Sequence, residues 1–433
     1  PLVTVANGGS LTLSNLTMNG GNGSLNPLLI NNNSSYSTAY SANSAKAPLI
    51  VVNSGGALTI TDDTVLKNNS NKPNTDANGA FAQSGYVGLG GAVYCGGTMT
   101  MTGGLIQNCE AQSGGGIYVE NGSFRLSGGT IDNNYARNIL AYGQTHATYR
   151  KNAGGGVYVG NNSSMVMSGG TVSNNQSSRE GGGVSLGWLN RTHGGAIYSY
   201  TTEFTMTGGN FIGNEALSTG GGLNVTAGWK ATVSAGYFTN NSAYGYDSQG
   251  DSYNGAYRVF SGGGIYVDAE QKNSSGEYAG VPGKLLLHRV VITQKHSDYE
   301  GGGIAACPTG KSRINCNLSN GTAIYNNTAI ASAGEFDEIC IENMNSNNDI
   351  ICNTVLGGGS YDWTSKTSNG YTNFGNTLTD SSPEIITARS LATVWITDNH
   401  GYLGGGIGNN GVIEVGGESE ETFLSFTITK VWG

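Results

Sequence analysis

The 433-residue chain has few charged residues and no long apolar run, and each scarcity excludes a class of protein. Charged residues make up 11% of the chain, the formal net charge is −9 and no Lys/Arg cluster is present, so we expect neither a nucleic-acid nor an anionic-membrane partner. No apolar stretch approaches the ~18 residues of a membrane-spanning helix, so we expect no membrane insertion. The cysteines have no CxxC spacing and no histidine lies in ligand register with them, so we expect no zinc and no other cofactor.

Glycine, in contrast, is abundant, with 72 residues that do not follow the G-X-Y period of collagen. The glycines mark a repeat, of which GGGIYVENGSFRLSGGTIDNN (Gly114–Asn134) is a clear example. Its spacing varies from roughly 23 to 40 residues, a range typical of stacked repeat architectures. Related segments begin at Gly90, Gly154, Gly194, Gly220, Gly262, Gly301 and Gly404.

Each repeat unit is predicted to contain three short strands. In Gly114–Asn134 the alternation of Ile117 and Val119, and then of Phe124 and Leu126, places apolar side chains on one face of two strands. Ile131 is the centre of a third. Glycines suit the corners between strands because they tolerate positive φ, and the Asn pair that ends the unit suits a turn. The unit therefore predicts one coil of a β-helix.

Stacked coils should align equivalent side chains in columns. We expect Ile117 to stack with Val157, Ile197 and Ile265. We expect Leu126 to stack with Met101, Met167 and Met206. The asparagines of one corner should form a ladder in which each side-chain amide bonds to the next coil.

Short GGA[IV] and FxxN motifs recur as an ordered array at Gly90–Val93, Gly194–Ile197, Phe211–Asn214 and Phe238–Asn241. With these motifs the repeat resembles the right-handed parallel β-helix repeats of large bacterial surface proteins, especially cell-wall-anchored adhesins of Gram-positive gut bacteria. It is more distantly similar to chlamydial polymorphic outer-membrane proteins. The resemblance implies an all-β fold, a right-handed single-stranded parallel β-helix with loop insertions, and an extracellular location on the bacterial cell wall.

The two ends of the chain suggest a fragment. SFTITKVWG (Ser425–Gly433) resembles the first strand of a collagen-adhesin B-type immunoglobulin-like stalk domain, and the acidic Gly416–Glu421 would be a linker before it. We therefore expect residues 1–415 to form the β-helix and residues 416–433 to form the linker and that strand. Leu2–Leu13 parallels Leu49–Ile60, so the chain starts in a strand. We expect a monomeric fragment of a larger surface protein whose N-terminal cap has been removed.

Four insertions, roughly Ser70–Leu89, Ala136–Ala153, Gln176–His193 and Ala243–Ser261, fall between an Asn corner and the next glycine run. Because equivalent corners lie on one side of a stack, we expect the inserted loops to cluster. They are rich in aromatic and arginine residues, which supply contact area and hydrogen bonds. The candidate binding residues are Tyr142, Tyr149, Arg150, Trp188, Arg191, Tyr246, Tyr253, Tyr257 and Arg258.

Two interpretations of these loops stay open: a face that binds a host glycan or glycoprotein, and lids that pack against the strands. The third insertion contains GGGVSL (Gly181–Leu186), so it is either a loop or a partial coil of the β-helix. An outward column of tyrosines has a similar pair of interpretations, an exposed aromatic strip for a polysaccharide or ordinary cross-strand stacking. That column contains Tyr94, Tyr118, Tyr158, Tyr198 and Tyr266.

The six cysteines fall as three sequence-near pairs, and an extracellular location permits disulfides. Small buried stack residues are the alternative for some of them. The candidate disulfide partners are Cys307 with Cys316, and Cys340 with Cys352.

The predicted function is that of a non-catalytic surface adhesin that binds host glycan or glycoprotein through the inserted loops. One alternative is a polysaccharide lyase or glycoside hydrolase, which would need two carboxylates about 5–9.5 Å apart on one face. The best charged cluster for an enzyme is Lys295, His296, Asp298 and Glu300, although a solvated polar turn explains it as well. Asn399–Gly401 echoes a polygalacturonase tripeptide without its acidic partners. A rigid structural spacer is a further alternative.

Overall fold

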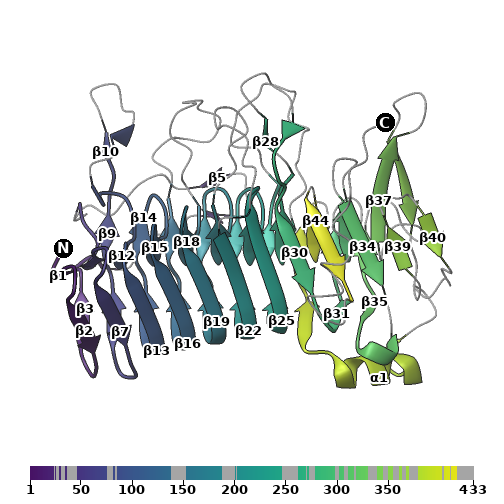
Figure 1. Cartoon of the computed structure of the whole chain (residues 1–433), viewed down its shortest axis with the longest axis horizontal. Helices are drawn as coiled ribbons and strands as arrows, with labels where there is room; N and C mark the ends of the chain where they lie inside the picture. Colours follow the sequence, from purple (N-terminus) through teal and green to yellow (C-terminus); the bar gives the residue numbers. More distant parts are fainter. Residues whose placement is uncertain are drawn as a thin grey trace.

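The computed structural model shows an all-β protein with mostly parallel sheets and a single α-helix, α1 (Pro383–Leu391), among the residues it describes. Strands lie side by side along the long axis of the molecule, and α1 lies at its lower edge (Figure 1). The described residues are 1–23, 25, 29–30, 35–36, 46–75, 81–82, 85–137, 153–187, 200, 202–245, 262–269, 271–272, 278–297, 302–306, 311–315, 318–329, 339–344, 350–354, 360–362, 367–369, 379–401, 404–409 and 411–416.

The first sheet contains the strands that follow the glycine runs, and we call it the twelve-stranded sheet. All its pairs are parallel except the last. In spatial order its strands are β1 Val3–Val5, β6 Ile50–Val52, β12 Val93–Cys95, β15 Ile117–Val119, β18 Val157–Val159, β21 Val184–Leu186, β24 Leu223–Val225, β27 Ile265–Val267, β43 Ile407–Asn409, β33 Ile304–Ala306, β37 Ile339–Met344 and β38 Ile350–Thr354.

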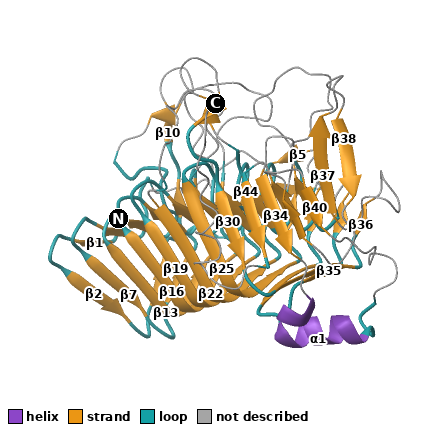
Figure 2. Ribbon diagram, turned by 45° about the vertical axis from the view of Figure 1, so that its right-hand side comes forward, coloured by secondary structure: helices purple, strands orange, loops and turns teal. Residues whose placement is uncertain are grey.

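The second sheet contains the longest strands, and we call it the long-strand sheet (Figure 2). In the middle of the molecule one long strand crosses this sheet where the sequence predicted two short ones, as β16 does over Phe124, Leu126 and Ile131, whereas two shorter strands cross it near the ends. Its strands are β2 Ser10–Leu13, β3 Thr17–Asn19, β7 Ala57–Ile60, β8 Val65–Lys67, β13 Thr98–Gln107, β16 Ser123–Asp132, β19 Ser164–Ser173, β22 Thr202–Ile212, β25 Trp229–Thr239, β30 Lys284–Leu287, β31 Val290–Thr293, β34 Lys311–Asn315, β35 Ala323–Tyr325, β39 Ser360–Asp362, β40 Thr367–Asn369, β41 Val394–Thr397 and β44 Val412–Val415.

The third sheet, which we call the nine-stranded sheet, consists of two-residue strands that follow the asparagine corner. These strands are absent from the three-strand prediction, because two residues between a turn and an insertion carry no visible alternation. They are β9 Ser70–Asn71, β14 Glu110–Ala111, β17 Tyr135–Ala136, β20 Gln176–Ser177, β23 Glu215–Ala216, β26 Ser242–Ala243, β42 His400–Gly401, β32 His296–Ser297 and β36 Thr328–Ala329.

Among the described residues, three short antiparallel pairs lie outside these sheets. They are β4 Leu29–Ile30 with β5 Ser35–Tyr36, β10 Asn74–Thr75 with β11 Phe81–Ala82, and β28 Gln271–Lys272 with β29 Tyr278–Ala279. A 3₁₀ turn, η1 (Leu318–Asn320), precedes β35.

We call one strand from each sheet at the same level a rung, and successive rungs stack in register. Leu126 lies opposite Met101 and Met167, and Met167 lies opposite Met206, as predicted. Ile117 lies opposite Val157. All of these side chains are fully buried, so the core is a set of continuous apolar columns. The predicted place of Ile197 is taken by Val184 on β21, and Ile197 itself lies outside the described residues.

Glycine pairs bend the long strands. Gly129 has φ +84°, and a Cβ there would lie 2.5 Å from the backbone oxygen of Gly103 in the preceding rung. The register shifts at this point in the β13–β16 pair. The glycines are therefore needed both for the backbone angle and for the close approach of successive rungs.

Two asparagine ladders run along the corner before the nine-stranded sheet, which confirms the predicted ladder. In the outer one, Nδ2 of Asn133 donates to Oδ1 of Asn108 at 3.3 Å, and both residues have positive φ. In the inner one, Nδ2 of Asn134 donates to Oδ1 of Asn175 at 3.0 Å, and both are buried. The inner ladder continues through Asn214, Asn241 and Asn399.

The rungs follow chain order as far as β27, after which the C-terminal segment enters the stack. β25 pairs with β30 through its first half and with β41 through its second half. β44 lies between β30 and β34, so the yellow strand lies among green ones in Figure 1. β43, which follows the glycine run at Gly404, therefore lies between β27 and β33 in the stack, although it comes after both in the sequence.

Candidate binding surface beside helix α1

Helix α1 covers part of the outer face of the long-strand sheet (Figure 2). Its Ile385 and Ala388 pack against Val291, Ala323 and Tyr325 in one buried cluster. Pro383 in the first turn is compatible with a helix start, and an acidic first turn with a basic last turn suits the helix dipole. The helix is therefore fixed by its apolar side, and its other side faces outward.

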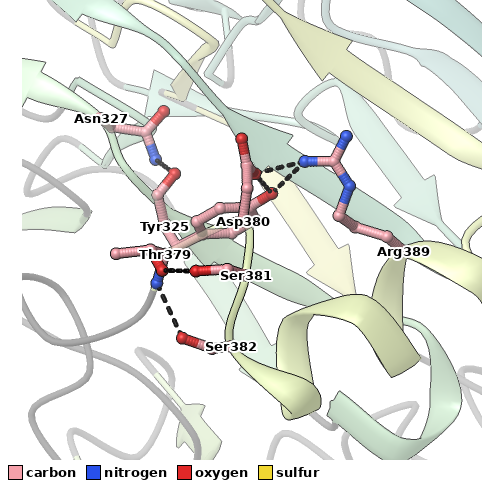
Figure 3. Close-up of polar contacts among 7 residues, drawn as sticks. All are labelled: Tyr325, Asn327, Thr379, Asp380, Ser381, Ser382 and Arg389. Carbon is pink, nitrogen blue, oxygen red and sulfur yellow. Dashed lines mark hydrogen bonds and ion pairs between the residues drawn. The ribbon is translucent and has the colours of Figure 1, made fainter.

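Tyr325, Asp380 and Arg389 form a polar network at the edge of this contact (Figure 3). The hydroxyl of Tyr325 donates to Oδ1 of Asp380 at 2.5 Å, and Nη1 of Arg389 donates to the same hydroxyl at 2.7 Å. Arg389 also forms an ion pair with Asp380. The backbone N–H of Thr379 donates to Oγ of Ser382 at 2.9 Å, which orders the turn before the helix.

Burial and neighbouring groups shift the pKa values of Tyr325 and Arg389. Burial, reinforced by the hydrogen bond to Asp380, raises the pKa of Tyr325 to about 12, although Arg389 opposes the change. Burial lowers the pKa of Arg389, but its contacts with Tyr325 and Asp380 outweigh that effect and raise it. At neutral pH the phenol is therefore a neutral donor and the guanidinium is positive.

A pair of aromatic rings continues the surface. The guanidinium of Arg389 lies 5.1 Å from the ring centroid of Trp395, a cation–π distance. Trp395 in turn stacks on Tyr237, with centroids 6.4 Å apart and planes at 13°. Tyr237 is 51% exposed. We call Tyr237, Trp395, Arg389, Asp380 and the Tyr325 hydroxyl the α1-edge surface.

The α1-edge surface combines flat apolar faces with charged hydrogen-bonding groups. The rings offer area at low entropic cost, while the guanidinium is a fixed fork of donors and the carboxylate is an acceptor. Asp380, at 53% side-chain exposure, is accessible to solvent. A sugar ring presents C–H faces and hydroxyl edges, so it matches both kinds of group.

The sequence prediction did not include this surface. Tyr237 and Trp395 each occupy an ordinary strand position, and only the stacking of β25 on β41 makes them neighbours. The helix had a detectable signal, because Ser382-Pro383-Glu384 is typical of a helix start. No local pattern indicates that this helix lies beside Tyr237.

The predicted loop site lies outside the described residues, so its nine positions stay predictions. The insertions after β9, β17 and β26 all leave the nine-stranded sheet and return to the twelve-stranded sheet, as expected. The third does not, because β20 ends one rung and β21 begins the next, so part of the predicted insertion belongs to the stack and the additional residues follow β21. The residues concerned are Tyr142, Tyr149, Arg150, Trp188, Arg191, Tyr246, Tyr253, Tyr257 and Arg258.

Three members of the tyrosine column form a stack and not an exposed strip, whereas Ser185 and Asn224 separate Tyr266 from them. The rings of Tyr94 and Tyr118 are 5.6 Å apart at 13°, and those of Tyr118 and Tyr158 are 4.8 Å apart at 12°. Tyr118, Tyr158 and Tyr266 are buried, and burial raises the pKa of Tyr118 and Tyr158 well above the usual value. Tyr198 lies outside the described residues, and Ser185 occupies its expected place.

Of the charged cluster considered for an enzyme, the structure describes Lys295 and His296, and Lys295 is not solvated. Lys295 is buried in line with the inner asparagine ladder, where its backbone N–H donates to Oδ1 of Asn327 at 3.0 Å. Burial lowers its pKa well below the usual range. His296 stacks on His400 from the adjacent strand, with centroids 5.3 Å apart. Asp298 and Glu300 lie outside the described residues.

The cysteines divide into two groups. Cys95 and Cys109 are buried free thiols whose pKa burial raises to about 11 and about 12, so both are unreactive stack residues. In the antiparallel pair β37–β38, Cys340 lies opposite Thr354, and Cys352 lies opposite Glu342. The side chains of Cys340 and Cys352, together with Cys307 and Cys316, fall outside the described part of the chain.

Within the described ranges, no group of three or more His, Cys, Asp or Glu side chains is arranged to hold a metal ion. Nor does any helix there have the length and hydropathy to span a membrane. No protein-family model, curated protein or solved structure matches the chain.

Proposed function

We propose that the protein is a non-catalytic extracellular surface protein, of the adhesin type, in which a right-handed parallel β-helix presents a glycan-binding site at the α1-edge surface. The β-helix assignment is supported by rungs that pair in parallel and in register while the chain visits the three sheets in a fixed order. The proposed site is on rigid elements, a strand of the stack and a packed helix. Rigid support favours binding, because little side-chain conformational freedom is lost on binding.

The single observation that supports glycan binding is the exposed Tyr237 ring stacked on Trp395 beside the Arg389–Asp380 ion pair. The Tyr237 ring stacks on Trp395 on one side and has the short side chain of Asn210 as its register partner on the other, so its exposed half can contact a sugar ring. The charged pair next to it can hydrogen-bond the hydroxyls at the edge of that ring. The surface contains one carboxylate, and that carboxylate is engaged by Tyr325 and Arg389, so it supports binding rather than two-carboxylate hydrolysis.

A rigid spacer is the second candidate function. It is supported by the buried asparagine ladder, whose amides bond from rung to rung across the stack. In this proposal the stack itself is the function, and any binding site is elsewhere.

The test is a glycan-array and host-glycoprotein binding screen with the full chain and three variants. Tyr237→Ala removes the exposed ring of the α1-edge surface. Tyr200→Ala is the matched control, because Tyr200 is also exposed and precedes the neighbouring strand β22. The third variant lacks residues 246–261, since Ala243 belongs to β26 and should be kept.

We expect one glycan class to bind, and we expect Tyr237→Ala to weaken that binding by about tenfold, as loss of one stacking contact would. Tyr200→Ala and the loop deletion should bind normally. Loss of binding only on loop deletion would move the site to the predicted loops and reject the α1-edge surface. Absence of any binding would reject the glycan proposal and leave the spacer.

A further inference from the structure

Between β30 and β31 the chain moves from one level of the stack to the next before the first rung is complete. β30 lies between β25 and β44, whereas β31 lies between β41 and β35. Only His288 and Arg289 connect the two strands, and Arg289 has φ +45°. The level of β30 therefore lacks its remaining strands, and β41 and β42 of the C-terminal segment supply them by stacking on β25 and β26.

The C-terminal segment fits this place as well as any rung in the middle of the molecule. Ile396 lies opposite Phe238 on one side and Ile292 on the other. Ile407 lies opposite Ile265 and Ile304 in the same way. All of these side chains are fully buried, so the apolar columns continue without interruption across the inserted segment.

The inner asparagine ladder continues across it as well. Asn399 accepts hydrogen bonds at Oδ1 from the backbone N–H and from Nδ2 of Asn241, both at 2.9 Å. Its own Nδ2 donates to the backbone oxygens of Phe238 at 3.0 Å and Thr397 at 2.9 Å. These contacts join residues about 160 positions apart with the same geometry that joins sequential rungs.

We infer that residues 394–415 are an interlocking segment, which docks last into a slot between two rungs and locks the C-terminal part of the stack to its middle. The docking order follows from the pairing. β41 needs both β25 and β31, and β43 needs both β27 and β33, so neither can form its full ladder until the flanking rungs exist. Contacts of such sequence separation form late. The inference is independent of glycan binding.

Engineered disulfides in the full-length chain test the position of the segment. Thr239 and Thr397 are register partners whose Oγ1 atoms are 3.2 Å apart. Thr239 and Thr293 are two rungs apart, about 9.6 Å, which exceeds the roughly 7 Å limit for a disulfide. Peptide mapping should find the cross-link in T239C/T397C and not in T239C/T293C. The opposite result would mean that rungs stack in chain order and would overturn the inference.

Pulse-labelling hydrogen exchange during refolding tests the docking order. Amides of residues 394–409 should become protected after those of residues 202–243. Asn399→Ala should speed native-state exchange of residues 394–409 by about 100-fold, because it leaves several buried groups without partners. Asn175→Ala is the matched control, because it removes the same kind of ladder contact from a sequential rung and should leave residues 394–409 unchanged. Simultaneous protection of both segments would contradict late docking.

Discussion

The middle of the molecule and its C-terminal part use the same interactions but connect them differently. From β12 to β26 each rung follows the previous one in sequence, and a single long strand of about ten residues spans the long-strand sheet. From β27 onward the corresponding strand is divided into two, and a segment from the C-terminus completes the rung. The stacking geometry is nevertheless continuous across the boundary, as the buried asparagines show.

This comparison shows that local side-chain chemistry, and not chain order, determines which strands can be neighbours. An apolar column, a buried asparagine and a glycine corner make any rung compatible with any other. At His288–Arg289 the chain leaves the level of β30 and enters the next level at β31. The following predictions test whether the two parts are energetically equivalent.

The largest effect is expected where the two parts meet. Phe238 lies in β25, its ring stacked on Phe211 at 4.7 Å and 3°, with Ile396 of the inserted segment on its other side. Phe238→Ala should lower the free energy of unfolding by about 3–5 kcal/mol through lost burial and a cavity, as measured by urea denaturation. Tyr237→Ala on the same strand should cost much less, because that ring is half exposed. Equal losses would show that β25 does not face the core as described.

The ladder should contribute equally in both parts. Asn134→Ala removes the acceptor of the Cys109 N–H and the donor to Ile106, which leaves buried groups without partners. We expect it to cost about 3 kcal/mol, since each such group costs about 1–3 kcal/mol. Asn399→Ala should cost a similar amount in the same denaturation experiment. A neutral Asn399→Ala variant would separate the two parts and contradict a continuous ladder.

A smaller effect is expected at the outer corner, where φ is positive. Asn133 has φ +54°, and Asn133→Ala should cost about 1–2 kcal/mol because alanine tolerates this region poorly. The C-terminal part has Gln294 with φ +55° at a corner of the same kind. Gln294→Gly should therefore stabilise the protein by about 0.5–1 kcal/mol. Thermal denaturation of both variants checks the signs, and a destabilised Gln294→Gly protein would argue against this backbone geometry.

The smallest effect is a pH dependence confined to the C-terminal part. The pKa of Tyr325 is raised to about 12 from an ordinary value of 10.0, so the folded state holds this proton more tightly than the unfolded state. Its contribution to stability is complete below pH 10 and is lost as the pH rises toward 12. The melting temperature of wild type should fall more steeply than that of Tyr325→Phe over this range. Identical slopes would show that the phenol is not buried against Asp380.

Much of the middle of the molecule could be predicted from the sequence. The partners of Leu126, the asparagine ladder and the glycine corners follow from side-chain type at a fixed repeat position. The sequence does not determine which glycine run, the one at Gly181 or the one at Gly194, leads into the strand that follows β18. The structure shows that Val184 of the first run occupies this position. The repeat pattern therefore determines what a rung contains better than it determines which segment supplies it.

The place of the C-terminal segment and the α1-edge surface could not be predicted. The motif at Gly404 is compatible with any level of the stack, so the sequence does not indicate that β43 lies between β27 and β33. Tyr237 and Trp395 become neighbours only through that placement. Long-range order of this kind has no local signal in the sequence.

The sharpest test of the interlocked arrangement is native-state hydrogen exchange of the 433-residue chain, comparing residues 394–415 with residues 1–19. The rung of residues 1–19 has a paired neighbour on one side among the described residues, whereas the inserted segment has neighbours on both. We predict that residues 394–415 exchange as slowly as residues 202–243 and far more slowly than residues 1–19. Exchange of residues 394–415 as fast as that of residues 1–19 would contradict the interlocked arrangement.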